Sequence, residues 1–192
     1  MSNDERKTRD PARTRQALLD GAARALLAHG ASVSLDVIAR EAGVSKGGLL
    51  HHFPAKDTLL IALAEHLADR FAAAVQAQLD PDDDAPGRLV RAYVRATLHE
   101  IDQGEIVREE ATLMAALSTI PEVVRRAQEH TRTWRDAFAA DGLDPRRTTL
   151  ITRAADGTAA AALFEGRLDP AEVTATRDEL IALSRGTGPL VP

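Results

Sequence analysis

Residues 35–53 read LDVIAREAGVSKGGLLHHF, and this stretch decides the fold. Apolar residues recur at helical spacing before Gly43, and Leu49 and Phe53 continue that spacing after it. Gly43 allows the left-handed backbone turn that a bulkier residue would resist. The stretch therefore predicts two short helices joined by a tight turn, which is the layout of a helix-turn-helix. The second helix of such a motif lies in the major groove of DNA.

Capping residues and glycines predict the helices around this turn. Apolar residues from Arg13 onward recur at helical spacing, and Gly30 is expected to end that helix. Ser34 and Ser45 are suited to cap the second and third helices, because a serine hydroxyl accepts a hydrogen bond from a free N–H of the first turn. The residues expected in the small core of this module are Ile38, Val44, Leu49 and Phe53.

The remainder of the chain also has a helical pattern. A long helix is expected from Lys56 to about Leu79, and segment 80–86, with two prolines and four aspartates, predicts a loop. The sequence thus predicts an all-α fold, in which an N-terminal three-helix module is joined by a long helix to a C-terminal helical domain. Further helices are expected at about 86–103, 105–118, 121–140, 145–165 and 170–184.

Charge is distributed unevenly along the chain. Residues 1–56 contain nine Lys or Arg and six Asp or Glu, whereas the rest contains fifteen and twenty-three. A basic module on an acidic body can bind DNA while the DNA phosphates repel the body. The alternative explanation of this distribution is chance clustering of solvent-exposed charges. We divide the chain into a flexible basic arm (1–12), a helix-turn-helix domain (13–55) and a helical body (56–188).

Composition narrows the class of protein further. The chain has 192 residues, of which 44% are hydrophobic and 28% charged, as is typical of soluble globular proteins. It has no cysteine, which excludes disulfides and thiolate metal sites and suits the cytoplasm. Neither a signal peptide nor a membrane span is expected, because no apolar stretch is long enough.

With these motifs in place, the sequence resembles the TetR family of bacterial transcriptional regulators. Segment 38–45 matches the family's turn, segment 46–53 matches its recognition helix in part, and segment 56–59 matches the next helix start. The resemblance covers about residues 13–62. It departs at Leu50 and His52, where the family usually has tyrosines that resemble phosphate contacts.

The position of the recognition helix identifies candidate DNA contacts. Lys46 is the leading candidate, because lysine pairs with guanine or acts as a point charge on phosphate. His52 can donate a hydrogen bond to phosphate, whereas Leu50 cannot. Simple capping remains the alternative for Ser34, and an ordinary surface lysine for Lys56. The full set is Arg6, Lys7, Arg9, Ser34, Ser45, Lys46, Gly47, Gly48, His51, His52 and Lys56.

The resemblance implies a C-terminal domain that binds a small-molecule effector and dimerises. Apolar faces with a few polar groups at 90–101, 107–117 and 123–138 suggest a pocket between these three helices, although ordinary helix packing is the alternative. The candidate pocket residues are Tyr93, Thr97, Glu110, Met114, Leu117, His130, Trp134 and Phe138.

Small residues in segment 148–163 suggest a homodimer interface, because they let helices approach closely. An internal helix hairpin is the alternative. The candidate interface residues are Ile151, Ala155, Thr158, Ala159 and Ala162.

The sequence therefore favours a ligand-responsive repressor that binds double-stranded DNA as a homodimer at a near-palindromic operator. The alternative is a DNA-binding regulator that a protein partner controls and that has no small-molecule pocket. An enzyme is not expected, because the sequence shows no set of a nucleophile, a base and an orienting group that could form a catalytic site. No cofactor is expected. No metal site is expected either, because no two histidines have the His-x-x-x-His spacing of metal ligands on one helix.

Overall fold

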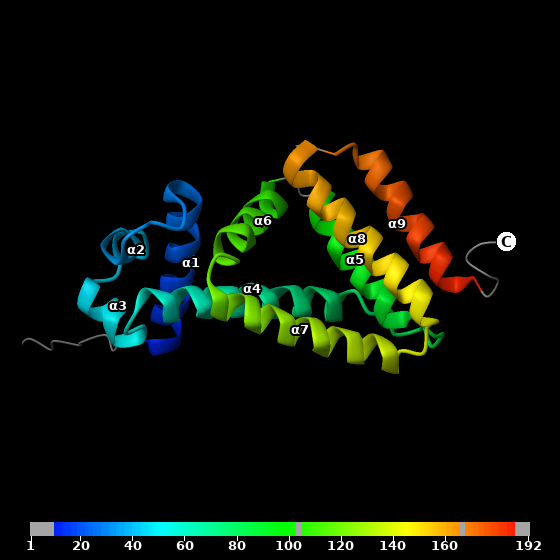
Figure 1. The fold of residues 1–192 in the computed structure, drawn as a ribbon, viewed down its shortest axis with the longest axis horizontal. Helices are drawn as coiled ribbons and strands as arrows, with labels where there is room; N and C mark the ends of the chain where they lie inside the picture. Colours follow the sequence, from blue (N-terminus) through cyan, green and yellow to red (C-terminus); the bar gives the residue numbers. More distant parts are fainter. Residues whose placement is uncertain (1–9, 103–104, 166–167, 187–192) are drawn as a thin grey trace, which may run out of the picture.

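The computed structural model describes residues 10–102, 105–165 and 168–186, and within them the chain is all-α, as predicted. The three-helix module lies at one end of the molecule, and α4 and α7 run from it towards a group of three helices at the other end (Figure 1). The helices are α1 (Pro11–His29), α2 (Leu35–Glu41), α3 (Lys46–His52), α4 (Lys56–Ala77), α5 (Arg88–Asp102), α6 (Glu105–Leu117), α7 (Pro121–Ala140), α8 (Pro145–Glu165) and α9 (Pro170–Arg185).

The two helices of the helix-turn-helix are capped as the sequence predicts. The Ser34 hydroxyl accepts a hydrogen bond from the backbone N–H of Val37 at 3.4 Å. The Ser45 hydroxyl accepts one from the backbone N–H of Gly48 at 3.1 Å. Each bond satisfies an N–H that has no partner within its own helix, and so fixes where α2 and α3 begin.

Two glycines allow the turn to pack against α1. Gly43 has a φ of 64°, in the left-handed region that favours glycine. Gly21 lies on α1, where an added Cβ would stand 2.7 Å from the Cα of Ala42. The close approach of α1 to the end of α2 therefore requires a glycine at position 21.

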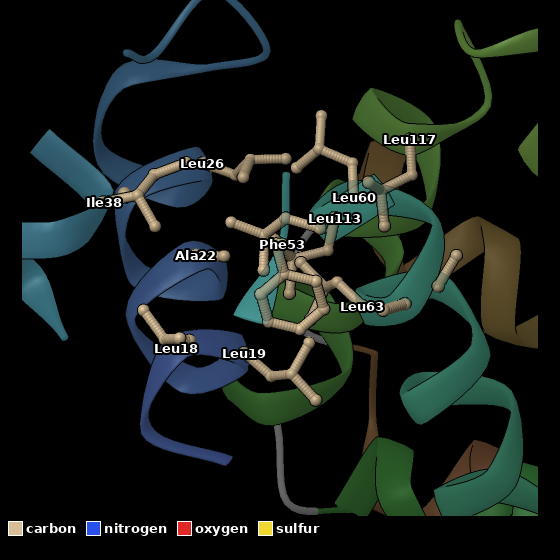
Figure 2. Close-up of a cluster of buried hydrophobic side chains, with 14 of the residues drawn as sticks. Leu18, Leu19, Ala22, Leu26, Ile38, Phe53, Leu60, Leu63, Leu113 and Leu117 are labelled. Atoms are coloured by element: carbon tan, nitrogen blue, oxygen red, sulfur yellow. The ribbon is translucent and has the colours of Figure 1, made fainter. Parts of the chain in front are cut away.

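One hydrophobic core holds the DNA-binding module together and extends beyond it. Leu18, Ile38 and Leu49 are fully buried, and Phe53 is 4% exposed. Figure 2 shows that Leu113 and Leu117 of α6 meet the α4 leucines in this same cluster. The first turns of α4 and the end of α6 thus belong to the core of the N-terminal module.

A second core joins α5, α8 and α9. Val90, Val94, Ile151 and Ala155 are fully buried there, and Leu180 of α9 closes the cluster. These three helices contact one another along much of their length. They form a stable body at the end of the molecule opposite to α3 (Figure 1).

A buried ion pair ties the loop before α5 to this body. The Arg91 side chain is fully buried, and its Nε and Nη2 donate to the two carboxylate oxygens of Asp83 at 2.6 and 2.7 Å. Its remaining N–H groups donate to the backbone oxygens of Ala85 and Pro86 and to the Ser184 hydroxyl. Hydrogen bonds from Arg91 hold the pKa of Asp83 below its ordinary value.

None of the helices within the described residues combines the length and the apolar character that crossing a membrane requires.

Candidate DNA-binding surface and effector cavity

The recognition helix α3 has one buried and one exposed side. Leu49 is fully buried, whereas Lys46, Leu50 and His51 are exposed, with Leu50 39% exposed. Because the buried side anchors α3 on the first core, its polar side is held outward. Of the predicted contacts on α3, Lys46, Gly47 and His51 are therefore exposed, whereas Gly48 and His52 are half-buried.

Lys46 forms an ion pair on this surface. Its Nζ lies 2.9 Å from Oδ2 of Asp36, and the two side chains are 55% and 64% exposed. An exposed ion pair contributes about 0–1 kcal/mol, so Lys46 can exchange Asp36 for a phosphate or a base edge at little cost. This geometry is compatible with the predicted contact, whose role remains a prediction.

The two glycines of α3 have different surroundings. A Cβ on Gly47 would meet nothing within 4 Å, whereas a Cβ on Gly48 would stand 2.9 Å from Cγ1 of Val44. Gly48 is therefore explained at least in part by packing against the turn. Gly47 is open to solvent and offers bare backbone on the exposed side of the helix.

The other predicted DNA contacts have varied surroundings. Lys56 donates from Nζ to the backbone oxygen of Ala31 at 2.6 Å, which ties the start of α4 to the loop after α1. His51 is exposed and His52 half-buried, with their rings 5.5 Å apart. The proposed contacts of the basic arm, Arg6, Lys7 and Arg9, lie outside the described residues.

A cavity of about 400 Å³ opens between α7 and α8, with Tyr93 of α5 also in its lining. Its volume falls within the range of about 300–1,000 Å³ that is typical of small-molecule sites. The rings of Trp134 and Phe138 stack at 5.5 Å, and Tyr93 stands edge-on to both. The sequence prediction placed the pocket between α5, α6 and α7, so its position is corrected to α5, α7 and α8.

Of the eight predicted pocket residues, the structure brings three to this cavity: Tyr93, Trp134 and Phe138. Thr97, Met114, Leu117 and His130 do not line it. Leu117 points into the first core because α6 packs on α1 and α4, and Met114 is 38% exposed. Thr97 is buried within the body, His130 lies half-buried, and the Glu110 side chain is outside the described residues.

Sequence reasoning missed the contribution of α8 to this cavity. Thr148, Thr149 and Thr152 line it, together with Arg153 and Asp156. The threonines stand out in the sequence, but their abundance there suggested a dimer interface. The loop between Ala140 and Pro145 turns α8 back beside α7, and this places the threonines in the same lining as Trp134.

A hydrogen bond links α5 to α8 at the cavity wall. The Tyr93 hydroxyl donates to Oδ1 of Asp156 at 2.6 Å, and Nη1 of Arg153 lies 3.6 Å from Oδ2 of the same carboxylate. Burial, and then the carboxylate, raise the pKa of Tyr93 well above its ordinary value. Tyr93 therefore stays protonated and remains a hydrogen-bond donor across the physiological range.

Two residues of the predicted dimer interface need correction. Ile151 and Ala155 are fully buried in the second core, where α8 packs on α5, so they have no surface to offer a second copy. Thr158 and Ala159 are half-buried, and the Ala162 side chain is outside the described residues. The outward side of α8 instead carries Leu150, which is 49% exposed, with Gly157 and Ala160.

A helix-turn-helix held on a helical body is the architecture of a DNA-binding regulator. Residues 18–63 match the family described as "Bacterial regulatory proteins, tetR family", and residues 87–185 match "Tetracyclin repressor-like, C-terminal domain". The chain belongs to the TetR family of bacterial transcriptional regulators, which are not enzymes.

Two curated relatives match part of the chain. The chain is 36% identical over 95 residues to the HTH-type transcriptional repressor LfrR of Mycolicibacterium smegmatis, which covers 50% of this chain and 48% of LfrR. It is 39% identical over 64 residues to the HTH-type transcriptional regulator RutR of Escherichia coli K12, which covers 33% of this chain and 29% of RutR. The chain thus spans about half the length, or less, of these relatives.

Solved structures resemble the chain over nearly its whole length. A transcriptional regulator from Rhodococcus sp. RHA1 has a TM-score of 0.69 at 27% identity, covering 91% of this chain and 95% of that one. The multidrug binding protein EbrR, in complex with malachite green, has a TM-score of 0.69 at 27% identity, covering 88% of this chain and 96% of EbrR. A regulator from Pseudomonas aeruginosa PAO1 shares the fold at a TM-score of 0.75 and 17% identity, covering 96% of this chain and 97% of that one.

Proposed function

We propose that this TetR-family regulator is a ligand-responsive repressor that binds a near-palindromic operator as a homodimer in the cytoplasm. The observation that carries the proposal is the outward polar side of α3, held on a buried anchor at Leu49 and led by Lys46. We assign DNA binding to residues 13–55, and effector binding and dimerisation to residues 56–188. Of the arm proposed over residues 1–12, Pro11 and Ala12 belong to α1, so the proposed groove contacts are those of Arg6, Lys7 and Arg9.

Dimerisation supplies the second half of the operator contact. Two recognition helices about 34 Å apart reach successive major grooves on one side of the duplex, which explains a near-palindromic site. We place the interface on the outward side of α8, around Leu150, Gly157 and Ala160. Arg153 lies on the same side of α8, so in this proposal the interface adjoins the mouth of the cavity. Leu150 is 49% exposed, and a Cβ on Gly157 would meet nothing within 4 Å, so a second helix has room to approach there.

The cavity beside Trp134 supports a small-molecule effector. EbrR, which shares this fold, was solved in complex with malachite green. A regulator controlled by a protein partner alone has no need of such a cavity, so the cavity favours the small-molecule alternative.

Contacts between α4 and α7 provide a route from the cavity to the DNA-binding module. The Phe71 ring of α4 packs edge-on against Trp134 with ring centroids 6.0 Å apart. Nη1 of Arg126 on α7 donates to Oε1 of Glu65 on α4 at 2.6 Å. A ligand that moves α7 therefore also moves α4, which carries α3 at its N-terminal end. It lowers DNA affinity only if it binds the DNA-incompetent arrangement more tightly.

Selection of bound sequences from random double-stranded DNA at moderate salt tests the proposal. The expected result is a near-palindromic site whose half-sites are about one helical turn apart. Mass measurement of the complex should give two chains per site. A regulator that selects no sequence, or that binds a single half-site as one chain, contradicts the proposal.

A further inference from the structure

The threonines of the cavity between α7 and α8 have already used their donor hydrogens. The hydroxyls of Thr131, Thr148, Thr149 and Thr152 each donate to the backbone oxygen four residues earlier, at distances of 2.8–3.1 Å. Each therefore offers a ligand only a methyl group and an acceptor oxygen. The threonines do not supply donors for a ligand's polar group.

The single carboxylate of the lining is also engaged. Asp156 accepts the Tyr93 hydroxyl at 2.6 Å and lies 3.6 Å from Arg153. Arg135, on α7, lines the same cavity and forms no ion pair with any residue in the described part of the chain. The lining thus has two guanidinium groups against one carboxylate, and Arg135 keeps its donors for a ligand.

The apolar part of the lining lies next to these charges on α7. Trp134 and Phe138 stack with an interplanar angle of 27°, and Arg135 follows Trp134 in the sequence. Arg135 is exposed and the Arg153 side chain is 70% exposed, so both arginines stand where the cavity meets solvent. The cavity is therefore apolar and aromatic inside and positively charged at its edge.

We infer that the effector is an amphipathic organic acid, with a carboxylate that pairs with Arg135 and Arg153 and an apolar body that lies against Trp134 and Phe138. Guanidinium groups match carboxylates because their N–H donors form paired hydrogen bonds with the two oxygens. The inference rests on the proposed function, since it gives the ligand class of the proposed effector cavity.

Trp134 is the only tryptophan of the chain and lines this cavity, so its fluorescence reports on a ligand that binds there. We would titrate the full-length protein with three probes of one shape: 4-butylbenzoate, neutral 4-butylbenzamide and cationic 4-butylbenzylammonium. The variants are Arg135→Gln and Arg153→Gln. Arg132→Gln is the matched control, because Arg132 is exposed on α7 but does not line the cavity. DNA binding is measured on the same samples.

The benzoate should quench Trp134 at the lowest concentration. Each cavity variant should weaken its affinity about tenfold, the loss expected for a charge-assisted hydrogen bond, and leave the benzamide unaffected. Arg132→Gln should change neither. Equal binding of all three probes, tighter binding of the cation, or no quenching by any of them overturns the inference. Because DNA binding is a separate readout, these results leave the regulator proposal standing, whereas benzoate binding without DNA binding contradicts that proposal alone.

Discussion

The two larger hydrophobic cores in the described part of the molecule differ in the polar groups buried near them. The first core, around α1–α4 and α6, is built from apolar side chains such as Leu18, Ile38 and Leu49. In the described part of the chain, every buried polar or charged side chain lies from Asp83 to Ser184, in the C-terminal body. The N-terminal module is thus a rigid support for one exposed helix, whereas the body combines buried charge with a cavity.

The largest expected effect comes from the buried ion pair of the body. Asp83→Ala leaves the Arg91 guanidinium buried without its carboxylate, so the free energy of unfolding should fall by about 3–5 kcal/mol. Urea unfolding measures this change. Asp82→Ala, one residue away at an exposed position, should cost less than about 0.5 kcal/mol. Equal effects of the two variants would show that the pair does not stabilise the body.

The same pair predicts how stability depends on pH. Because Arg91 lowers the pKa of Asp83 in the folded state, the unfolded chain binds a proton at this carboxyl more readily than the folded chain. The pair therefore stabilises the fold above the ordinary pKa of about 4, and this stabilisation is lost as the pH falls below it towards the folded pKa. The urea concentrations at which wild type and Asp83→Asn are half unfolded should become more alike as the pH is lowered from 7 to 3. A difference between the two midpoints that stays constant over this range would contradict the prediction.

A substitution in the first core should separate the two regions. Gly21→Ala places a Cβ against the backbone of Ala42, so the module should lose about 1–3 kcal/mol of stability and bind DNA more weakly. The Trp134 fluorescence, which reports on the body, should remain unchanged. Gly47→Ala is the matched control: it has open space and should stabilise α3 by up to about 1 kcal/mol. If Gly21→Ala is as stable as wild type, the packing of α1 against Ala42 does not require a glycine at position 21.

A smaller effect is expected at the exposed Leu50, where the TetR pattern usually has a tyrosine. Leu50→Tyr should restore a hydrogen bond to phosphate and tighten operator binding by about 1 kcal/mol, or about fivefold. Leu50→Phe, which has the ring without the hydroxyl, should not tighten binding. Equal gains from both variants would assign the effect to ring packing instead.

The same comparison explains what the sequence could predict. The caps at Ser34 and Ser45 and the all-α fold depend on local patterns, and the structure confirms them. The first helix begins at Pro11 and not at Arg13 as expected, because Asp10 caps it and a proline suits its first position. The pocket and the interface depend on how the helices are arranged in space, which local sequence patterns do not show. Ile151 and Ala155 have the small or apolar character of an interface, yet α5 covers them, and no spacing in the sequence indicates that contact.

If the outward side of α3 reads DNA, loss of the Lys46 side chain must weaken operator binding. The measurement is the affinity of wild type and Lys46→Ala for the selected operator and for its single-base variants at fixed salt. We expect a loss of about 1–3 kcal/mol with relaxed preference at one position of each half-site if Lys46 contacts a base, or a uniform loss across sequences if it contacts phosphate. Unchanged affinity for every sequence would contradict the account.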